Sequence, residues 1–583
     1  MSPLVKGGGY LFEAIDSTSI FTPEDFDDEH RLIAESLSSF LAEKVFANMD
    51  AIEAKQKGLM KELLVEAGKY GFLGMDIEEK YGGTETDEIC STIIAEKLGP
   101  TGAFAVGHGG HTGIGNLPIV YFGNEEQKAA YLPAIATAEK ISCYALTEPG
   151  SGSDALSAKT RAVLADDKSH YIINGSKTFI TNAGIADILI VYAKVDGEKF
   201  TAFIVDGDSE GLSIGADEIK MGLKGSSTCS VFFDNVKVPA ENLLFETGKG
   251  HVVAFNILNI GRHKVAANSV GGAKYALDQA IAYANERKQF NTPIARFGLI
   301  KEKLAEMAIR IYAAESTVYR TAGILNEMME SLPGDHSGQD LAGGIAEYAL
   351  ECSLEKVFAT EVEGFVVDEA VQIHGGYGYI AEYPVERLYR DARIRRIFEG
   401  TNEINRTIIP TTLVKRGGSG VLPLIKESAG LIEKVKAQED WPARETPEDI
   451  VQACKDVFLF CIGLCQEKLA GKLLSHQEIL GHLADIAIYA YTMESSLLRT
   501  RKAEAKNSRN SELKNQLATA FIHSSMTRVV QTAMELIANL ASGSTLRQLR
   551  NELIRLTSVE PIDIITIRAT IADTISAAGK YEV

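Results

Sequence analysis

Glu399 is the residue whose neighbours in the sequence are best suited to proton transfer. It follows an aromatic residue, Phe398, and precedes Gly400. A carboxylate beside a ring and a glycine can lie in a dry pocket, where the loss of solvation raises its pKa towards the range that a general base needs. Just upstream, Arg387–Arg396 contains five arginines, a pattern that on its own is more typical of a solvated or ion-paired face.

Three other segments combine glycines, hydroxyls and aromatic rings. Tyr144–Asp154 (YALTEPGSGSD) runs from a strand-like start into a turn whose backbone N–H groups and hydroxyls suit an anionic or heteroaromatic ligand. Lys177–Asn182 (KTFITN) is strand-like, and on its own such a segment more often packs a core. Gln372–Tyr379 (QIHGGYGY) has glycines that would let a ligand approach the backbone, although a plain loop has the same composition.

Several other chemistries lack their local patterns. No GxGxxG opens a helix after a strand, and there is no Walker loop, HExxH or GxSxG. His108 and His111 lie three residues apart in a glycine-rich segment but have no acidic or cysteine partner nearby, so we expect no metal site. The seven cysteines form no CxxC pair, which indicates structural thiols in a reducing compartment.

The spacing of apolar residues predicts the elements that must hold these segments. Up to about residue 140, and again from about 251, the apolar period is helical, whereas 141–250 contains β-rich runs such as Ile188–Val195. We expect a helix to start at Thr22-Pro23 and a hairpin turn at Asn174-Gly175. The β-rich part should form a small antiparallel barrel or sandwich, and the fold class is mainly α with a β insert.

This pattern predicts four units. They are an N-terminal helical domain (1–140), a β domain (141–250), a helical bundle domain with Glu399 (251–415) and a C-terminal helical extension (421–583). The glycine-rich Lys415–Gly420 between the last two is expected to be a linker.

Charge and hydropathy limit the partners. The formal net charge of −20 repels nucleic acid and anionic membranes at long range. Acidic residues flank one local basic cluster in the C-terminal extension, so a solvated helix face is a better interpretation of it than membrane association, which stays possible. The cluster consists of Arg499, Arg501, Lys502, Lys506 and Arg509.

No targeting segment or membrane span is evident, so a cytoplasmic protein is expected.

Together these segments resemble the acyl-CoA dehydrogenase family. TEPGSGSD, KTFITN, ERKQF, QIHGGYGY and IFEGTNEI occur in the family's order and spacing from about residue 25 to 410, and the extra helical tail resembles the very-long-chain branch. The resemblance implies an FAD-dependent enzyme of fatty acid β-oxidation. It would convert an acyl-CoA to the trans-2-enoyl-CoA, with Glu399 as the base, and pass electrons to electron transfer flavoprotein. Small residues at Gly107, Gly109 and Gly110 favour a medium-to-long acyl chain.

Two alternatives remain open on the same fold. The first is an acyl-CoA oxidase or flavin monooxygenase that uses O2, and the second is a non-catalytic flavoprotein assembly factor.

Some family members carry their base just before an arginine on another helix. Here that position is Gly261, before Arg262, which leaves Glu399 as the candidate.

The resemblance also assigns binding residues. For the flavin and pyrophosphate these are Tyr144, Leu146, Thr147, Gly152, Ser153, Phe179, Ile180, Thr181, Thr401, Asn402 and Glu403. For the acyl-CoA they are Ser153, Arg262, Phe398, Glu399 and Gly400. The adenylate half of FAD would be held by a neighbouring subunit, which implies a homodimer or a dimer of dimers, through Arg287, Gln289, Phe290, Gln372, Ile373, His374, Gly375 and Gly376.

Overall fold

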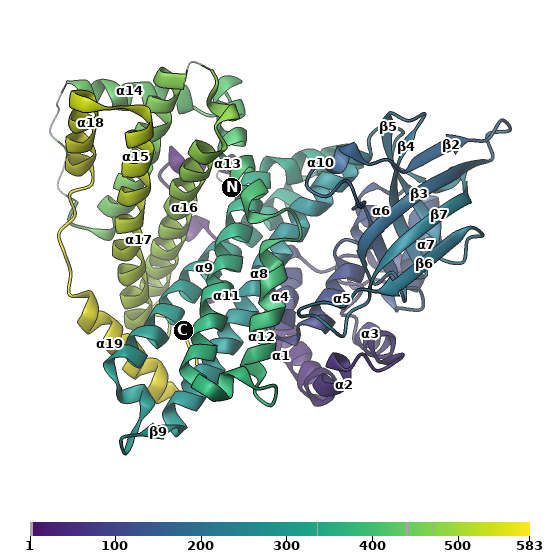
Figure 1. Ribbon diagram of the computed structural model, residues 1–583, viewed down its shortest axis with the longest axis horizontal. Coiled ribbons are helices and arrows are strands. Elements are labelled where there is room, and N and C mark those ends of the chain that lie inside the picture. Colours follow the sequence, from purple (N-terminus) through teal and green to yellow (C-terminus); the bar gives the residue numbers. More distant parts are fainter. Residues whose placement is uncertain (1–3, 335, 438–440, 442–443, 470) are drawn as a thin grey trace.

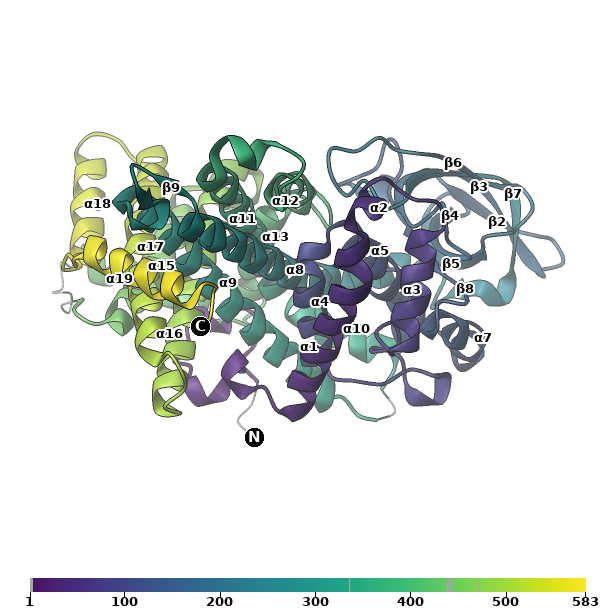
Figure 2. The ribbon, with the colours of Figure 1, turned by 90° about the horizontal axis from the view of Figure 1, so that it is seen from below.

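The computed structural model describes residues 4–334, 336–437, 441, 444–469 and 471–583. A β-sheet and short helices lie at one end of the molecule, long helices fill the middle, and the C-terminal helices form the other end (Figures 1 and 2). The predicted fold class, mainly α with a β insert, is therefore confirmed.

Within the described residues seven α-helices precede the sheet, and the first of them starts later than predicted. Thr22 and Pro23–Asp25 form only a single 3-10 turn with a capping box. Phe26 then leaves the helical conformation and packs its ring against Tyr319, with the centroids 5.1 Å apart. The helix begins at Asp28 instead. The seven are α1 (Asp28–Phe40), α2 (Met49–Glu53), α3 (Leu59–Lys69), α4 (Glu88–Leu98), α5 (Ala103–Thr112), α6 (Leu117–Phe122) and α7 (Glu125–Ala136).

The sheet is open rather than a closed barrel. Its strand order is β6-β7-β3-β2-β4-β5-β8, with β1 paired in parallel to β4, and among the described strands the two edges, β6 and β8, are not joined. The strands are β1 (Ser142–Ala145), β2 (Arg161–Leu164), β3 (His170–Thr181), β4 (Ile188–Val195), β5 (Lys199–Asp206), β6 (Leu212–Asp217), β7 (Thr228–Pro239) and β8 (Leu243–Leu244).

The predicted hairpin at Asn174-Gly175 is wrong. Strand β3 continues through both residues and pairs with β7 on either side of them, with a register shift between Ile173 and Gly175. A Cβ at Gly175 would lie 2.5 Å from Thr160 Oγ1. The glycine therefore permits a close approach to the neighbouring chain within a bulge, not a reversal of the chain.

Long helices form the centre of the molecule. The 37-residue α8 packs along α11, and both carry residues of the candidate site. The elements of this part are α8 (Gly250–Glu286), β9 (Lys288–Gln289), β10 (Thr292–Pro293), α9 (Gly298–Ser331), α10 (Gly338–Glu347), α11 (Ala349–His374), α12 (Pro384–Ala392) and α13 (Asn402–Gly418).

The predicted linker at Lys415–Gly420 is mostly helical. Helix α13 continues to Gly418, because a Cβ at Gly417 would lie 2.9 Å from Leu424 Cβ and only a glycine admits this close packing. The extension that follows consists of α14 (Leu424–Lys436), α15 (Pro447–Leu469), α16 (Gln477–Ala505), α17 (Ser511–Leu540), α18 (Gly543–Leu556) and α19 (Ile564–Ala578).

The extension packs onto the central helices and onto the N-terminal segment. Tyr10 donates a hydrogen bond to the Ala487 carbonyl at 3.0 Å, and the buried Arg499 pairs with Glu24 and Glu315. The other members of the predicted basic cluster, Arg501, Lys502, Lys506 and Arg509, also pair with carboxylates, so the cluster is largely neutralised within the chain. The interpretation as a solvated helix face is wrong for Arg499 and Lys502, because both are buried in these contacts. In the described ranges, no helix is long and apolar enough to cross a membrane.

Candidate active site

Glu399 lies in a strained turn before α13. Its φ is +55° and that of Gly400 is +82°, so two successive residues are left-handed, and the first is not a glycine. Side chains from three helices hold the carbonyl groups of this turn. Arg262 Nε donates to the Glu399 carbonyl at 3.1 Å, while Lys356 Nζ and Asn405 Nδ2 donate to the Gly400 carbonyl at 2.8 and 2.9 Å.

One oxygen of the Glu399 carboxylate is withdrawn from solvent. Its Oε2 is buried and has no hydrogen-bond partner within the described part of the chain. Burial raises the pKa of Glu399 to about 7, although the positive charges of Arg262 and Lys356 oppose the shift. A carboxylate with this pKa can accept a proton near neutral pH, as a general base must.

Helix α8 makes room for this carboxylate at Gly261. A Cβ at Gly261 would lie 3.0 Å from Glu399 Oε2, so the family's two alternative base positions are neighbours in space. The next residue, Arg262, is buried and also donates to Asn259 Oδ1 at 2.7 Å. The structure thus brings Arg262, Glu399 and Gly400 together, as expected for the acyl-CoA residues.

The TEPGSGSD and KTFITN segments lie side by side. The Thr178 N–H donates to the Thr147 carbonyl at 2.9 Å, and Lys177 Nζ donates to the Leu146 carbonyl at 3.1 Å. Lys177 also forms a buried ion pair with Glu148 at 2.7 Å. Two segments that are separate in the sequence therefore form one surface, the first directly after β1 and the second at the end of β3.

Phe179 presents an exposed ring on that surface. Its side chain is 65 % exposed and its φ is +59°, at a register shift between β3 and β7. Around it Leu146 and Ile180 are buried, Thr147 and Thr181 are partly buried, and Gly152 and Ser153 are exposed. An exposed ring flanked by hydroxyls is a platform on which a flat heteroaromatic ligand can stack.

Tyr144 connects this surface with Glu399. The side chain is buried and donates to the Ala254 carbonyl of α8 at 3.4 Å. Burial raises the pKa of Tyr144, and the charge of Glu399 contributes to the increase. The strand end and the carboxylate are therefore close enough to interact electrostatically.

The residues after Gly400 shape the turn. Thr401 caps α13 by accepting a hydrogen bond from the Ile404 N–H at 3.3 Å. Asn402 is 2 % exposed, and its amide interacts with Lys356, Thr360 and Glu361 inside the protein. Glu403 is exposed, and Phe398 is partly buried.

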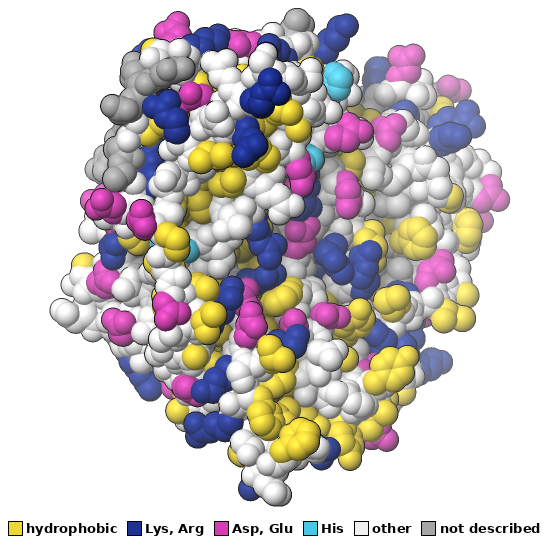
Figure 3. All heavy atoms as spheres, turned by 60° about the vertical axis from the view of Figure 1, so that its left-hand side comes forward, with side chains coloured by type: hydrophobic (Ala, Val, Ile, Leu, Met, Phe, Trp, Pro, Cys, Tyr) yellow, Lys and Arg dark blue, Asp and Glu magenta, His cyan; other side chains and the backbone are white. Residues whose placement is uncertain are grey.

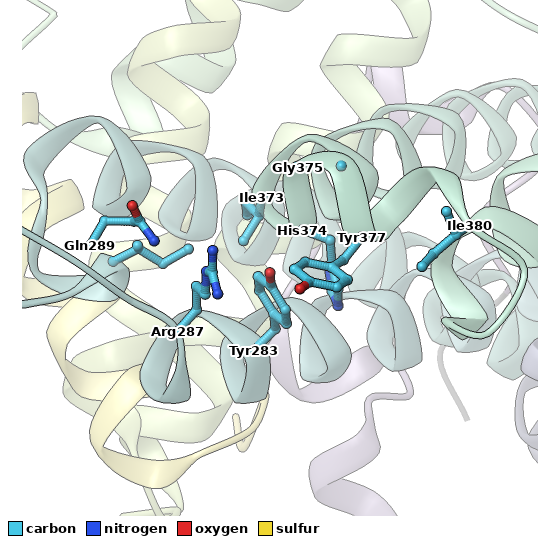
Figure 4. Close-up of a pocket in the computed structure, with 10 residues that line it drawn as sticks. Tyr283, Arg287, Gln289, Ile373, His374, Gly375, Tyr377 and Ile380 are labelled. Atoms are coloured by element: carbon cyan, nitrogen blue, oxygen red, sulfur yellow. The ribbon is translucent and has the colours of Figure 1, made fainter.

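The segments assigned to the adenylate half form a separate pocket of about 450 Å³ (Figure 4). In it the Arg287 guanidinium lies 5.6 Å from the Tyr377 ring centroid, and Tyr283 stacks on His374 at 4.2 Å. Phe290 and Gln372 are exposed but do not line it. The lining residues are Tyr283, Arg287, Gln289, Ile294, Ile373, His374, Gly375, Gly376, Tyr377 and Ile380.

This pocket is distant from Glu399 of the same chain. Gly261 and Tyr283 are both on α8, and a rise of about 1.5 Å per residue separates them by about 33 Å. The structure therefore places the predicted cofactor residues in two groups at different levels of one helix.

A smaller cavity of about 40 Å³ lies among α4, α5 and α8. Gly109 lines it, and a Cβ there would meet open space, whereas a Cβ at Gly107 would lie 2.9 Å from Met60 Sδ and one at Gly110 2.9 Å from Thr181 Cγ2. Asp76 and Lys264, paired at 2.8 Å, also line the cavity. Of the three glycines that we expected to leave room for the acyl chain, only Gly109 borders this cavity.

The sequence interpretation missed Lys356 and the Lys177–Glu148 pair. Lys356 directly follows Glu355 on a long helix, and two adjacent charged residues do not by themselves indicate that the lysine is buried. Its partner Gly400 is 44 residues away, so the contact itself has no local signal.

Four sequence models match the chain. They are described as acyl-CoA dehydrogenase N-terminal domain (residues 27–139), middle domain (143–236) and C-terminal domain (248–413), and a further acyl-CoA dehydrogenase C-terminal domain (453–555). The last of these lies in the extension.

Individual proteins agree with these matches. A probable acyl-CoA dehydrogenase of Bacillus subtilis is 47 % identical over 585 residues, which cover 99 % of this chain and 98 % of the relative. The solved structure of an acyl-CoA dehydrogenase complexed with FAD from Bacillus anthracis is 46 % identical, with a TM-score of 0.97, and the match covers 99 % of this chain and 100 % of that one.

Two more distant relatives match about two thirds of the chain. The human mitochondrial very long-chain specific acyl-CoA dehydrogenase is 38 % identical over 376 residues, which cover 62 % of this chain and 54 % of the relative. The caffeyl-CoA reductase-Etf complex subunit CarC of Acetobacterium woodii is 39 % identical over 397 residues, which cover 67 % of this chain and 100 % of the relative.

Proposed function

Because the chain belongs to the acyl-CoA dehydrogenase family, an FAD-dependent family of oxidoreductases, we propose that Glu399 abstracts the α-proton of a medium-to-long-chain acyl-CoA. The product would be the trans-2-enoyl-CoA of fatty acid β-oxidation. One observation carries the proposal: a buried carboxylate oxygen without a hydrogen-bond partner, in a group whose pKa burial raises to about 7.

The chain's own residues account for the proton transfer. An α C–H is a weak acid, so the base must be placed in advance and competing water excluded. The contacts of Arg262, Lys356 and Asn405 with the turn fix the backbone of the base, and burial removes water from Oε2. The Glu399 N–H donates no hydrogen bond within the described part of the chain, which leaves it available to polarise the thioester carbonyl.

The residues present fit a flavin. Phe179 offers an exposed ring, with the partly buried Thr147 and Thr181 beside it. When bound, FAD supplies the acceptor for the hydride that leaves the β-carbon. We propose that the flavin and pyrophosphate residues assigned above hold it, with Thr401 and Asn402 acting through the shape of the turn.

The acyl preference is supported by Gly109. It borders the cavity among α4, α5 and α8, and open space lies where its Cβ would be. This cavity follows Gly261 along α8, and we propose that the acyl chain extends towards it beyond the reacting carbons. Measurement of kcat/KM for acyl-CoA substrates from C4 to C20 should give a maximum well above C4, and a maximum at C4 would overturn the assignment.

We propose a homodimer in which each FAD contacts two chains. The adenylate pocket lies about 33 Å along α8 from the Glu399 of its own chain, so we propose that it serves the partner's flavin. Hydrophobic side chains gather over the lower part of the molecule, the level of β9 (Figure 3), and Phe290 there is 91 % exposed. Phe290→Asp should lower both the mass measured by light scattering and the FAD content per chain. A monomeric wild-type protein with full FAD would contradict the dimer.

Electron transfer flavoprotein is the proposed acceptor. The support is the relative that is named as a subunit of a complex with Etf, together with the family membership. Stopped-flow reoxidation of the substrate-reduced enzyme should be fast with electron transfer flavoprotein and slow with air. Rapid reoxidation by air would favour the oxidase or monooxygenase alternative.

An anaerobic titration tests the proposed dehydrogenation and the role of Glu399 in it. Octanoyl-CoA and palmitoyl-CoA should bleach the flavin absorbance of the purified holoenzyme, and Glu399→Gln should bind both without bleaching. If neither substrate bleaches the wild-type flavin, the non-catalytic alternative becomes the better interpretation.

A further inference from the structure

Lys356 is a fully buried cation at the candidate base. It lies on α11, and its side chain is among the largest that are completely inaccessible to solvent. Its Nζ donates to the Gly400 carbonyl and to Asn402 Oδ1, both at 2.8 Å. Both hydrogen-bond partners are neutral, so no carboxylate in direct contact explains why an ammonium group is buried here.

The charged groups that most influence Lys356 lie in the turn and on three helices. They are Glu399 in the turn, Arg262 on α8, Glu361 on α11 and Glu403 on α13. Burial lowers the pKa of Lys356 to about 7, and the negative charge of Glu399 is the largest influence that opposes this shift. The lysine and the base therefore favour each other's charged state across the turn.

The two hydrogen bonds of Lys356 act on the strained part of the backbone. Gly400 and Glu399 are both left-handed, and rotation of either adjoining peptide plane would relieve that conformation. Arg262 holds the carbonyl of the first plane, whereas Lys356 and Asn405 hold that of the second. Lys356 also binds the Asn402 side chain at the start of α13, so it ties the turn to the next helix.

We propose that Lys356 is a positioning residue for the dehydrogenation: it locks the left-handed turn that directs the Glu399 carboxylate, and its charge stabilises the ionised base. The proposal rests on the proposed function of Glu399. Lys356 itself does not touch the reacting atoms in this assignment and acts only through the turn and through its charge.

Three variants of the FAD-loaded enzyme test this role. Lys356→Met removes both the charge and the hydrogen bonds, Lys356→Gln retains a donor without the charge, and Lys303→Met is the matched control, because Lys303 pairs with Glu369 away from the turn. FAD content and circular dichroism establish that each variant is folded. The kinetic readouts are kcat, KM and the pH profile of kcat/KM, together with the isotope effect of α-deuterated octanoyl-CoA.

Loss of the cation should move the acid limb of the kcat/KM profile to higher pH by about one unit in both Lys356 variants, because protonation of Glu399 becomes easier. Misplacement of the carboxylate should lower kcat of Lys356→Met by about 10- to 100-fold, with KM nearly unchanged and a larger isotope effect. Lys356→Gln should lose less of kcat, and Lys303→Met should behave like the wild type.

An unchanged acid limb in folded, FAD-loaded Lys356→Gln would overturn the proposal, even if Lys356→Met fails to fold. A change in KM alone would overturn it too, since a purely structural contribution to substrate binding predicts that result. The proposed function is judged separately: if Glu399→Gln still bleaches the flavin, Glu399 is not the base, whereas an inactive Glu399→Gln with a normal Lys356→Gln profile refutes only the role of Lys356.

Discussion

Replacement of Glu399 by glutamine would separate proton abstraction from the other properties of the site. Glutamine has nearly the same shape, so it should leave the turn and its contacts with Arg262 and Lys356 in place. It cannot accept a proton from carbon at neutral pH. Loss of a general base costs about 10²–10⁴-fold in rate, which corresponds to about 3–5 kcal/mol of transition-state free energy.

The same substitution should stabilise the fold in a pH-dependent way. The pKa of Glu399 is raised from 4.5 to about 7, so the folded protein holds this proton more tightly than the unfolded chain does. The wild type therefore loses stability as the pH rises through the window from about 4.5 to about 7, by about 3 kcal/mol in total. Glutamine carries no titrating group, so the variant should not show this loss.

Two measurements on the same samples test this reasoning. The rate of flavin bleaching under anaerobic conditions should fall by at least a hundredfold in Glu399→Gln, while the FAD content stays at the wild-type level. The thermal midpoint of the variant should match that of the wild type below about pH 4 and exceed it near pH 8. Retained bleaching would refute the role of Glu399 as base, and an equal thermal midpoint at pH 8 would refute its burial in the ionised state.

Three further substitutions test other parts of the site. Gly261→Glu combined with Glu399→Gly should recover part of the kcat/KM that Glu399→Gly alone loses, since a Cβ at Gly261 lies 3.0 Å from the present carboxylate oxygen; equal activities of the two variants would contradict this. Lys177→Met leaves Glu148 buried and unpaired, so it should lower the free energy of unfolding in denaturant by about 3–5 kcal/mol and lower the FAD content. Full FAD retention would count against a flavin site on the surface that this ion pair supports. Gly109→Leu should fill the cavity and reduce kcat/KM for C16 more than for C8, whereas an unchanged chain-length profile would show that the acyl chain lies elsewhere.

Elements with a strong local pattern could be predicted from the sequence. Strand β4 has the predicted bounds Ile188–Val195, and the helical period predicted from about residue 251 corresponds to α8 and α9. Most apolar residues of these elements are buried, so the spacing of apolar residues along the sequence is enough to identify each element. The order of the five motifs likewise indicates the family without any knowledge of the contacts.

Predictions failed where a distant contact overrode a local signal. Asn174-Gly175 has the composition of a hairpin turn, but pairing of β3 with β7 on both sides keeps it extended. The glycines after Lys415 resemble a linker, yet packing of Gly417 on Leu424 extends the helix. In both places the glycine provides room for a neighbour, a use that composition alone does not distinguish from flexibility.

The contacts that make Glu399 a base are also distant in the sequence. Its carbonyl binds Arg262 from 137 residues away, and the carbonyl of Gly400 binds Lys356 from 44 residues away. A motif search finds the carboxylate because its neighbours are local, but it does not find the groups that set the turn. The strength of the base therefore depends on helix packing that the IFEGT motif does not contain.

The C-terminal extension contributes to that packing. Helix α13 starts directly after the turn, and one of its first residues, Arg406, binds both Glu361 on α11 and Asp485 on α16 of the extension. Because Glu361 also accepts a hydrogen bond from Asn402, the extension is connected to the turn through a continuous chain of charged and amide groups. The extension thus forms part of the scaffold that holds the candidate base, in addition to covering the hydrophobic faces of α9 and α13.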